Sequence, residues 1–214
     1  VALKALYKCF AYLRDNADLS IAADIYEPEA SFTEVLRQTD CDNEWRFCSD
    51  TDHAGNREVQ NRMRSQNGEY AGLNGGPFSW YSKASSVTFA CEKIGEAHAD
   101  TSSTAVEIYG VGNATQNILG HSYVVEEMGI EFPFPFQLEM DNRAAQIFCQ
   151  GSALKTKLKH IDCRQEWVQT LRNKSIMNPV WIPTKDNLAD LFTKILPLQD
   201  FIRLRDQMLR PASS

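Results

Sequence analysis

The sequence predicts an α/β domain whose mixed sheet is covered by helices on both faces. Three stretches that alternate apolar and polar residues come first, at 45–55, 68–73 and 78–82, with a turn at 74–77. Alternation of this kind, interrupted by a turn rich in Gly and Asn, predicts an antiparallel meander. Later in the chain strands alternate with helices, which is typical of a sheet with helices on both sides.

Composition narrows the class of protein. The chain has 214 residues, of which 43% are apolar, enough for one domain and an appendage. It has neither a run of about eighteen apolar residues nor a signal-peptide pattern, so we expect an intracellular protein, neither secreted nor in a membrane. The six cysteines form no CxxC pair, which argues against a zinc site and fits a reducing compartment. Because the chain begins with Val, we expect a piece of a longer polypeptide.

The charge balance does not by itself favour a nucleic-acid partner. The chain has 22 basic and 28 acidic residues, a net charge of −6, whereas proteins that bind nucleic acid are usually basic. Basic residues nevertheless gather in one segment, 155–174. Such a run is able to grip phosphates, although it is more often a solvated face.

The remaining elements follow from periodicity and caps. An apolar stripe predicts a helix over 2–14, and a short strand and a linker follow it, with a boundary near 38–44. A long helix from 104 to about 128 begins at a Ser-Ser-Thr cap and ends at Gly129. We expect the others in this order: a strand at 136–141, helices at 144–149 and 156–173, a strand at 180–182, and helices from 188 onward.

Acidic residues stand at the ends of several predicted elements. Asp50 lies near the end of the first strand, Asp141 ends the strand at 136–141, and Asp190 lies in the first turns of a late helix. Glu107 lies in the first turn of the long helix, off its apolar stripe. A carboxylate at the end of a rigid element is well placed to bind a metal ion. Each of these acidic residues, taken alone, is also explained as a polar residue at the end of a strand or as a surface carboxylate favoured by the helix dipole.

Six motifs occur in the order found in copia-type retrotransposon ribonuclease H domains, which the chain resembles over about residues 45–210. They read FCSDTDHAG, NGEYAGLNGGPFSWYSK, SSTAVEIYG with EEMGI, LEMDNRAAQIF, KLKHIDCR and IPTKDNLADLFTKILP. Residues 1–26 resemble the segment that closes the preceding reverse transcriptase. The resemblance implies two parts: residues 1–40 as the C-terminal segment of reverse transcriptase or its connection, and 41–214 as the ribonuclease H domain.

The same resemblance implies a fold and a function. The fold is ribonuclease H-like: a five-stranded mixed sheet, with three antiparallel strands and then two parallel ones, and helices on both faces. The function is that of an endonuclease that hydrolyses the RNA strand of RNA–DNA hybrids during retrotransposon reverse transcription. Its partners are then the hybrid and the reverse transcriptase of the same polyprotein, in the cytoplasm or the retrotransposon particle.

The active site that this family implies holds four carboxylates, which are both catalytic residues and metal ligands. Asp50 matches the family's Ser-Asp, Asp141 its Asp-Asn, and Asp190 its Leu-Ala-Asp. The fourth has two candidates, because this chain lacks one glutamate of the family's Ser-Ser-Thr-Glu-Ala-Glu-Tyr. The spacing from the Trp of the third strand favours Glu96, whereas the helix cap and the distance to the closing Gly favour Glu107, which we choose.

Hard cations fit such a site. Mg²⁺ prefers carboxylate oxygens to thiolates, and Mn²⁺ is its usual substitute. In the family two ions about 4 Å apart activate a water and stabilise the leaving alkoxide, which gives 3′-hydroxyl and 5′-phosphate ends.

Contacts to nucleic acid are expected on two segments. Asn142 and Arg143 follow Asp141 and are placed to reach the wide minor groove of a hybrid, although simple helix capping explains them equally well. The basic residues expected to contact phosphates are Lys155, Lys157, Lys159, His160 and Arg164.

Two other functions stay open at this stage. A ribonuclease H-like module without catalytic activity, serving as a nucleic-acid-binding or structural domain, fits the lost glutamate and the acidic charge. A transposase or integrase orders its acids Asp, Asp, Glu, whereas the Glu here comes second, which disfavours that class.

Overall fold

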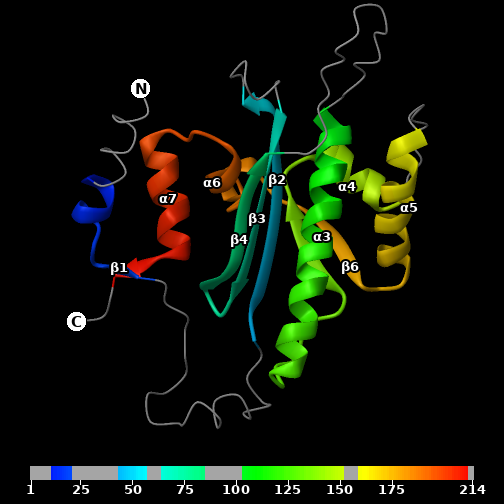
Figure 1. Ribbon diagram of the computed structural model, residues 1–214, viewed down its shortest axis with the longest axis horizontal. Coiled ribbons are helices and arrows are strands. Elements are labelled where there is room, and N and C mark those ends of the chain that lie inside the picture. Colours follow the sequence, from blue (N-terminus) through cyan, green and yellow to red (C-terminus); the bar gives the residue numbers. More distant parts are fainter. Residues whose placement is uncertain (1–10, 21–42, 57–63, 85–102, 152–158, 212–214) are drawn as a thin grey trace, which may run out of the picture.

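The computed structural model describes residues 11–20, 43–56, 64–84, 103–151 and 159–211 (Figure 1). The strands are β1 (Leu19–Ser20), β2 (Trp45–Asn56), β3 (Arg64–Leu73), β4 (Gly76–Ala84), β5 (Phe136–Met140), β6 (Met177–Trp181) and β7 (Arg210–Pro211). The helices are α3 (Ser103–Glu127), α4 (Arg143–Cys149), α5 (Lys159–Asn173), α6 (Asp190–Thr193) and α7 (Leu198–Met208), with a 3₁₀ turn η2 (Thr184–Asp186).

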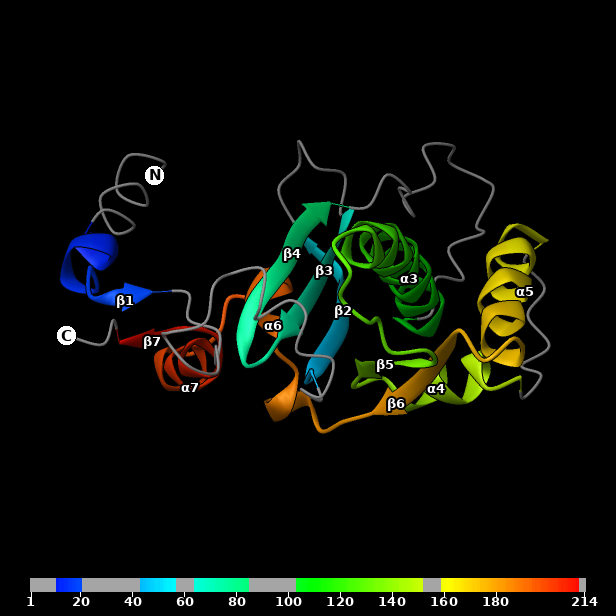
Figure 2. The same cartoon turned by 90° about the horizontal axis from the view of Figure 1, so that it is seen from below.

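One sheet organises the molecule. Its five strands follow the order β4-β3-β2-β5-β6. β2, β3 and β4 pair antiparallel, whereas β5 pairs parallel with both β2 and β6. This is the sheet predicted for the ribonuclease H-like fold, so the predicted fold class is confirmed. Helices α3, α4 and α5 lie on one side of the sheet and α6 and α7 on the other (Figure 2).

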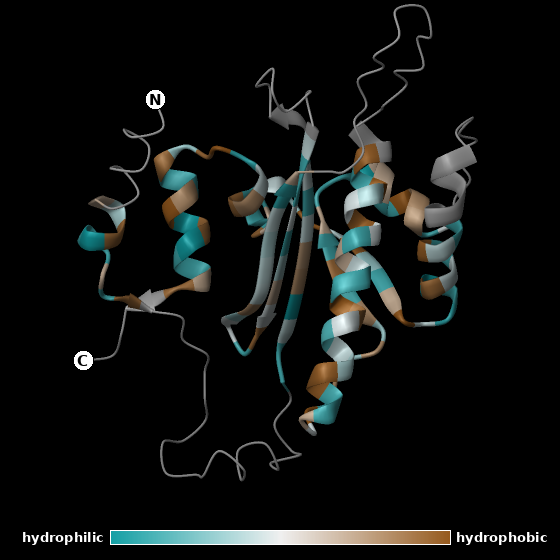
Figure 3. Ribbon diagram, in the orientation of Figure 1, coloured by the Kyte–Doolittle hydropathy of each residue, from teal (hydrophilic) through white to brown (hydrophobic). Residues whose placement is uncertain are grey.

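Each face of the sheet has its own apolar cluster. On the α3 side, Phe47, Phe136 and Leu138 pack with apolar residues of the helices, as the strand alternation predicted. On the other side, Cys48 and Tyr70 pack against residues such as Leu204 of α7. Hydrophobic residues accordingly lie interspersed with hydrophilic ones along the helices of both layers (Figure 3). The sheet is therefore a rigid support that is covered on both sides.

The long helix ends as the sequence predicted. Gly129 has a φ of 79°, in the left-handed region where glycine has no steric penalty. Its backbone N–H donates to the Glu126 carbonyl at 2.9 Å, and that of Ile130 donates to the Val125 carbonyl at 3.1 Å. These two bonds satisfy carbonyls that the helix end would otherwise leave free.

Several predicted boundaries were wrong, including those of the strand expected at 78–82, which runs over Gly76–Ala84. β3 begins at Arg64 instead of residue 68, because its polar first residues pair with the end of β2 and continue the ladder. β6 begins at Met177 instead of residue 180, and it contains Pro179. That proline is tolerated because β6 is an edge strand, where a missing N–H breaks no central ladder. The helix expected from residue 188 is interrupted at Lys194, whose backbone is extended.

The N-terminal segment lies beside the C-terminal helix. Residues 11–15 are helical, and the Tyr12 ring meets Phe201 of α7 edge-on at 5.6 Å between centroids. Arg205 donates to the Tyr12 hydroxyl at 3.2 Å and to the Asn16 side chain at 3.1 Å. β1 pairs antiparallel with β7. The first part of the predicted helix at 2–14 and most of the boundary at 38–44 lie outside the described residues.

Candidate active site

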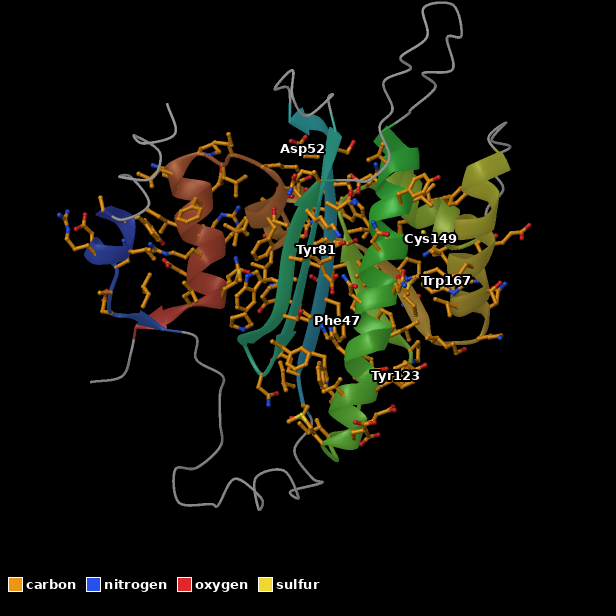
Figure 4. All side chains as sticks on the ribbon, viewed as in Figure 1. Phe47, Asp52, Tyr81, Tyr123, Cys149 and Trp167 are labelled. Carbon is orange, nitrogen blue, oxygen red and sulfur yellow. The ribbon has the colours of Figure 1, made fainter. Side chains whose placement is uncertain are left out.

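Three of the predicted carboxylates meet at one end of the sheet. Oxygens of Asp50, Glu107 and Asp141 all lie within 4.8 Å of one another. Asp50 comes from β2 and Asp141 follows β5, and these neighbouring strands are parallel, so their ends lie together. Glu107 comes from the first turns of α3, whose N-terminal end lies at the same end of the sheet (Figure 1). Asp52, labelled in Figure 4, marks this end of β2.

Asp190 joins the cluster through a lysine that we did not predict. The Lys194 ammonium donates to Asp190 Oδ1 at 2.7 Å and to Asp50 Oδ1 at 3.1 Å. It lies 3.9 Å from Asp141 Oδ2. The signal in the sequence was the Asp190/Lys194 spacing of four residues, which places both side chains on one face of a helical turn.

The segment before α6 is fixed to the sheet by Asn187. Its side-chain oxygen accepts the Ala189 backbone N–H at 3.1 Å, and its side-chain nitrogen donates to the Ser49 carbonyl at 3.1 Å. Arg46 of β2 donates to the Asp186 carbonyl at 2.8 Å. Asn187 therefore stabilises the turn before α6 and also holds α6 next to Asp50.

Burial raises the pKa of Glu107, Asp190 and Asp50. It raises the pKa of Glu107 to about 9, and the charges of Asp50 and Asp141 add to the shift. Burial, and then the Asp50 charge, raise the pKa of Asp190 to about 6. Burial also raises the pKa of Asp50, although Lys194 opposes that shift. For Lys194 burial disfavours the charged form, but the carboxylates, Asp50 first, outweigh it and raise its pKa.

The site suits a hard divalent cation. All its acidic donors are carboxylate oxygens, the ligands that Mg²⁺ and Mn²⁺ prefer, and the described residues bring no thiol or imidazole into the trio. Asp50 and Glu107 are buried, and the Asp141 side chain is 11% exposed. Clustered buried acids of this kind are stabilised by a cation.

The residues predicted to contact nucleic acid have different surroundings. The Asn142 side chain accepts the Ala145 backbone N–H at 3.0 Å, so it caps α4. Arg143 is exposed and stacks over the Trp181 ring at 5.2 Å from its centroid. Lys159, His160 and Arg164 belong to α5, but their side chains, like the whole of Lys155, Lys157 and Glu96, lie outside what the structure describes.

Relatives of this chain are retrovirus-related Pol polyproteins of plant transposons. The one from transposon TNT 1-94 of Nicotiana tabacum is 25% identical over 153 residues, which is 72% of this chain. Those from RE2 and RE1 of Arabidopsis thaliana are each 27% identical over 148 residues, 69% of this chain. The resemblance that the motifs suggested is therefore confirmed. The chain spans only 9–10% of the length of these polyproteins.

Solved structures with a similar chain trace are ribonuclease H proteins. LC11-RNase H1 in complex with an RNA/DNA hybrid has a TM-score of 0.47 and 14% identity, over 70% of this chain and 94% of that one. The N-terminal RNase H domain of rv2228c from Mycobacterium tuberculosis has a TM-score of 0.44 and 13% identity, over 76% of this chain and 98% of that one. No protein-family model matches the chain.

Proposed function

We propose that the chain is a metal-dependent ribonuclease H that hydrolyses the RNA strand of RNA–DNA hybrids during retrotransposon reverse transcription. The observation that carries the proposal is the meeting of Asp50, Glu107 and Asp141 within 4.8 Å at one end of the sheet. Asp50 and Asp141 are 91 positions apart in the sequence, with Glu107 between them, so no local pattern explains their meeting. The similarity to Pol polyproteins of plant transposons supports the retrotransposon part of this proposal.

In this proposal four carboxylates hold two Mg²⁺ ions, or Mn²⁺ in their place. Asp50, Glu107 and Asp141, whose oxygens lie within 4.8 Å of one another, would hold the ions together with Asp190. Bound ions of this kind activate a water and stabilise the leaving oxygen, which gives 3′-hydroxyl and 5′-phosphate ends. The chain itself supplies fixed oxygens: Thr193 donates its hydroxyl to Asp50 Oδ2, and Asn187 anchors the turn that carries Asp190.

The hybrid is proposed to lie across the exposed Arg143 and the basic helix α5. The contact of Arg143 with Trp181 holds the guanidinium beside Asp141, because the Trp181 indole donates to the Asp141 carbonyl at 3.0 Å. An Arg in such a position is suited to a phosphate. We also propose that residues 1–40 are the end of the preceding reverse transcriptase and that the nuclease domain begins at 41.

The test is metal-dependent cleavage of a labelled hybrid. We expect the chain to cut the RNA strand of an RNA–DNA hybrid in Mg²⁺ or Mn²⁺ and to leave duplex RNA intact. Asp50→Asn should lower the rate by about a hundredfold or more, because even partners of metal ligands are worth about 10–100-fold. Asp200→Asn, which removes a half-exposed carboxylate of α7, is the matched control and should keep the rate. Binding of the hybrid without cleavage would contradict the nuclease proposal and favour the alternative, a ribonuclease H-like module that binds nucleic acid without catalytic activity.

The identity of the glutamate is tested by two further variants. Glu107→Gln should abolish cleavage, because its carboxylate is buried in the acidic trio. Glu96→Gln should leave cleavage as it is. The opposite pattern would transfer the role to Glu96.

A further inference from the structure

Lys194 occupies the centre of the acidic site. Its ammonium lies 2.7 Å from Asp190 Oδ1, 3.1 Å from Asp50 Oδ1 and 3.9 Å from Asp141 Oδ2. It therefore contacts oxygens of three of the four carboxylates proposed as metal ligands. The Asp50 side chain is 1% exposed and that of Asp190 5% exposed, so these charges have little water around them.

The fold brings this lysine back into the site. α6 ends at Thr193, and the Lys194 backbone N–H donates to the Asp190 carbonyl at 3.0 Å. The side chain then reaches back over the same turn to Asp190. Thr193 donates to the other oxygen of Asp50, so consecutive residues of one short segment bind both oxygens of that carboxylate.

We propose that Lys194 is a built-in cation that fills the acidic site when no divalent ion is bound and that a divalent ion must displace. The inference rests on the metal part of the proposed function. A divalent cation and an ammonium compete for the same buried oxygens and repel each other at such distances. The Lys194 side chain is 30% exposed and has a flexible four-carbon stem, so it has a path outward to solvent.

This arrangement has a functional consequence. With the ammonium in place the carboxylates stay together in the absence of metal, which offsets their mutual repulsion. The same contact weakens the site for divalent ions, because part of the binding free energy is used to remove the ammonium. Lys194 thereby sets the metal concentration at which the site fills.

A purely positioning role makes the opposite prediction. If Lys194 only aligned the carboxylates for metal, its removal would weaken metal binding. If it competes with metal, its removal strengthens metal binding.

The experiment is a titration of Mn²⁺ alone into the full chain by isothermal calorimetry. For Lys194→Met we expect a Kd at least about tenfold lower than in the wild type, the lower end of the coupling measured for close charge pairs. Lys174→Met is the matched control, because it removes the same charge from an exposed position before β6, at the opposite end of the parallel strands. Its Kd should equal that of the wild type. An unchanged or higher Kd for Lys194→Met, or no Mn²⁺ binding by either protein, overturns the inference.

A second measurement uses the wild-type side chain itself. In ¹⁵N-lysine NMR the hydrogen-bonded ammonium of Lys194, assigned as the signal lost in Lys194→Arg, should be protected from exchange without metal. Saturating Mg²⁺ should abolish that protection. Protection that persists at saturation overturns the inference, even if Lys194→Met does not fold.

Neither measurement depends on cleavage, so a failure of the inference about Lys194 is distinguishable from a failure to cut the hybrid. If metal displaces Lys194 from the carboxylates but the chain does not cut a hybrid, only the nuclease proposal is contradicted. A chain that cuts the hybrid while Lys194 stays bound contradicts this inference alone.

Discussion

At the scale of single residues, burial decides what a carboxyl group does. Glu69 of β3 lies outside the acidic site and is 0% exposed. The Asn117 side chain of α3 donates to its Oε2 at 3.0 Å, whereas Oε1 has no partner among the described residues. Burial raises the pKa of Glu69 to about 8, so it carries a proton at neutral pH. β3 thus carries an acid, Glu69, that stays neutral inside the domain.

Glu69 should make stability depend on pH. Its pKa in the folded chain, about 8, lies above the ordinary 4.5, so the folded chain binds more protons between these values than the unfolded chain. This contribution to stability is complete below about pH 4.5 and falls as pH rises toward 8, by up to about 1.4 kcal/mol per pH unit. Glu69→Gln should remove it, and urea unfolding of both proteins at a series of pH values measures the difference.

The control for this prediction is Glu131→Gln, which changes an exposed residue. Its stability should follow that of the wild type at each pH. Parallel curves for Glu69→Gln and the wild type would contradict the assignment of the pH dependence to Glu69.

At the scale of elements, the contact between α6 and β3 decides where Asp190 lies. A Cβ added at Gly68 would lie 2.6 Å from Thr193 Cγ2, 2.9 Å from the Ala189 carbonyl oxygen and 3.0 Å from Phe192 Cβ. The helical turn therefore rests directly on the backbone of β3. This close approach needs glycine and holds Asp190 and Lys194 near Asp50.

Gly68→Ala should push α6 away from the sheet. We expect a loss of about 1–3 kcal/mol of stability, the usual effect of overpacking, together with slower cleavage because Asp190 moves with α6. Urea unfolding and the hybrid assay measure both.

Gly120→Ala is the matched control. It lies in α3, and an added Cβ would meet no atom within 4 Å in the described structure. It should therefore gain about 0.5–1 kcal/mol from helix propensity and keep the cleavage rate. Equal effects of the two alanines would refute the proposed contact.

Sequence patterns predicted these elements unevenly. Alternation located β2 and β5, and the Gly at the end of α3 located its last turn, because side-chain direction and backbone conformation are local properties. The short α6 was not predicted, because its end at Lys194 comes from packing on Gly68 and from bonds to Asp50.

At the scale of the whole molecule, bound metal should stabilise the fold. The ligands come from β2, α3, the end of β5 and α6, and the unfolded chain cannot hold them together. At a free Mg²⁺ or Mn²⁺ concentration a hundredfold above Kd, we expect about 2.7 kcal/mol of added stability. For a domain of this size that corresponds to a rise in Tm of roughly 5–10 °C.

Scanning calorimetry with and without the ion measures this shift. Removal of the ion with a chelator should return Tm to its starting value. A double variant, Asp50→Asn with Asp141→Asn, should show no rise in Tm. A rise of the same size in that variant would place the stabilising ion elsewhere. Among the described residues, no helix is both long and apolar enough to span a membrane.

The predictions from local pattern reach as far as the strands, the long helix and the identity of the candidate acids, because periodicity, caps and short motifs are properties of neighbouring residues. The convergence of Asp50, Glu107 and Asp141 needed the parallel pairing of β2 with β5 and the placement of α3, which act over long separations in sequence. The part played by Lys194 was not predicted from the sequence, for the same reason. Its role depends on Asp50, 144 positions away in the sequence, which comes near Lys194 only when the chain has folded.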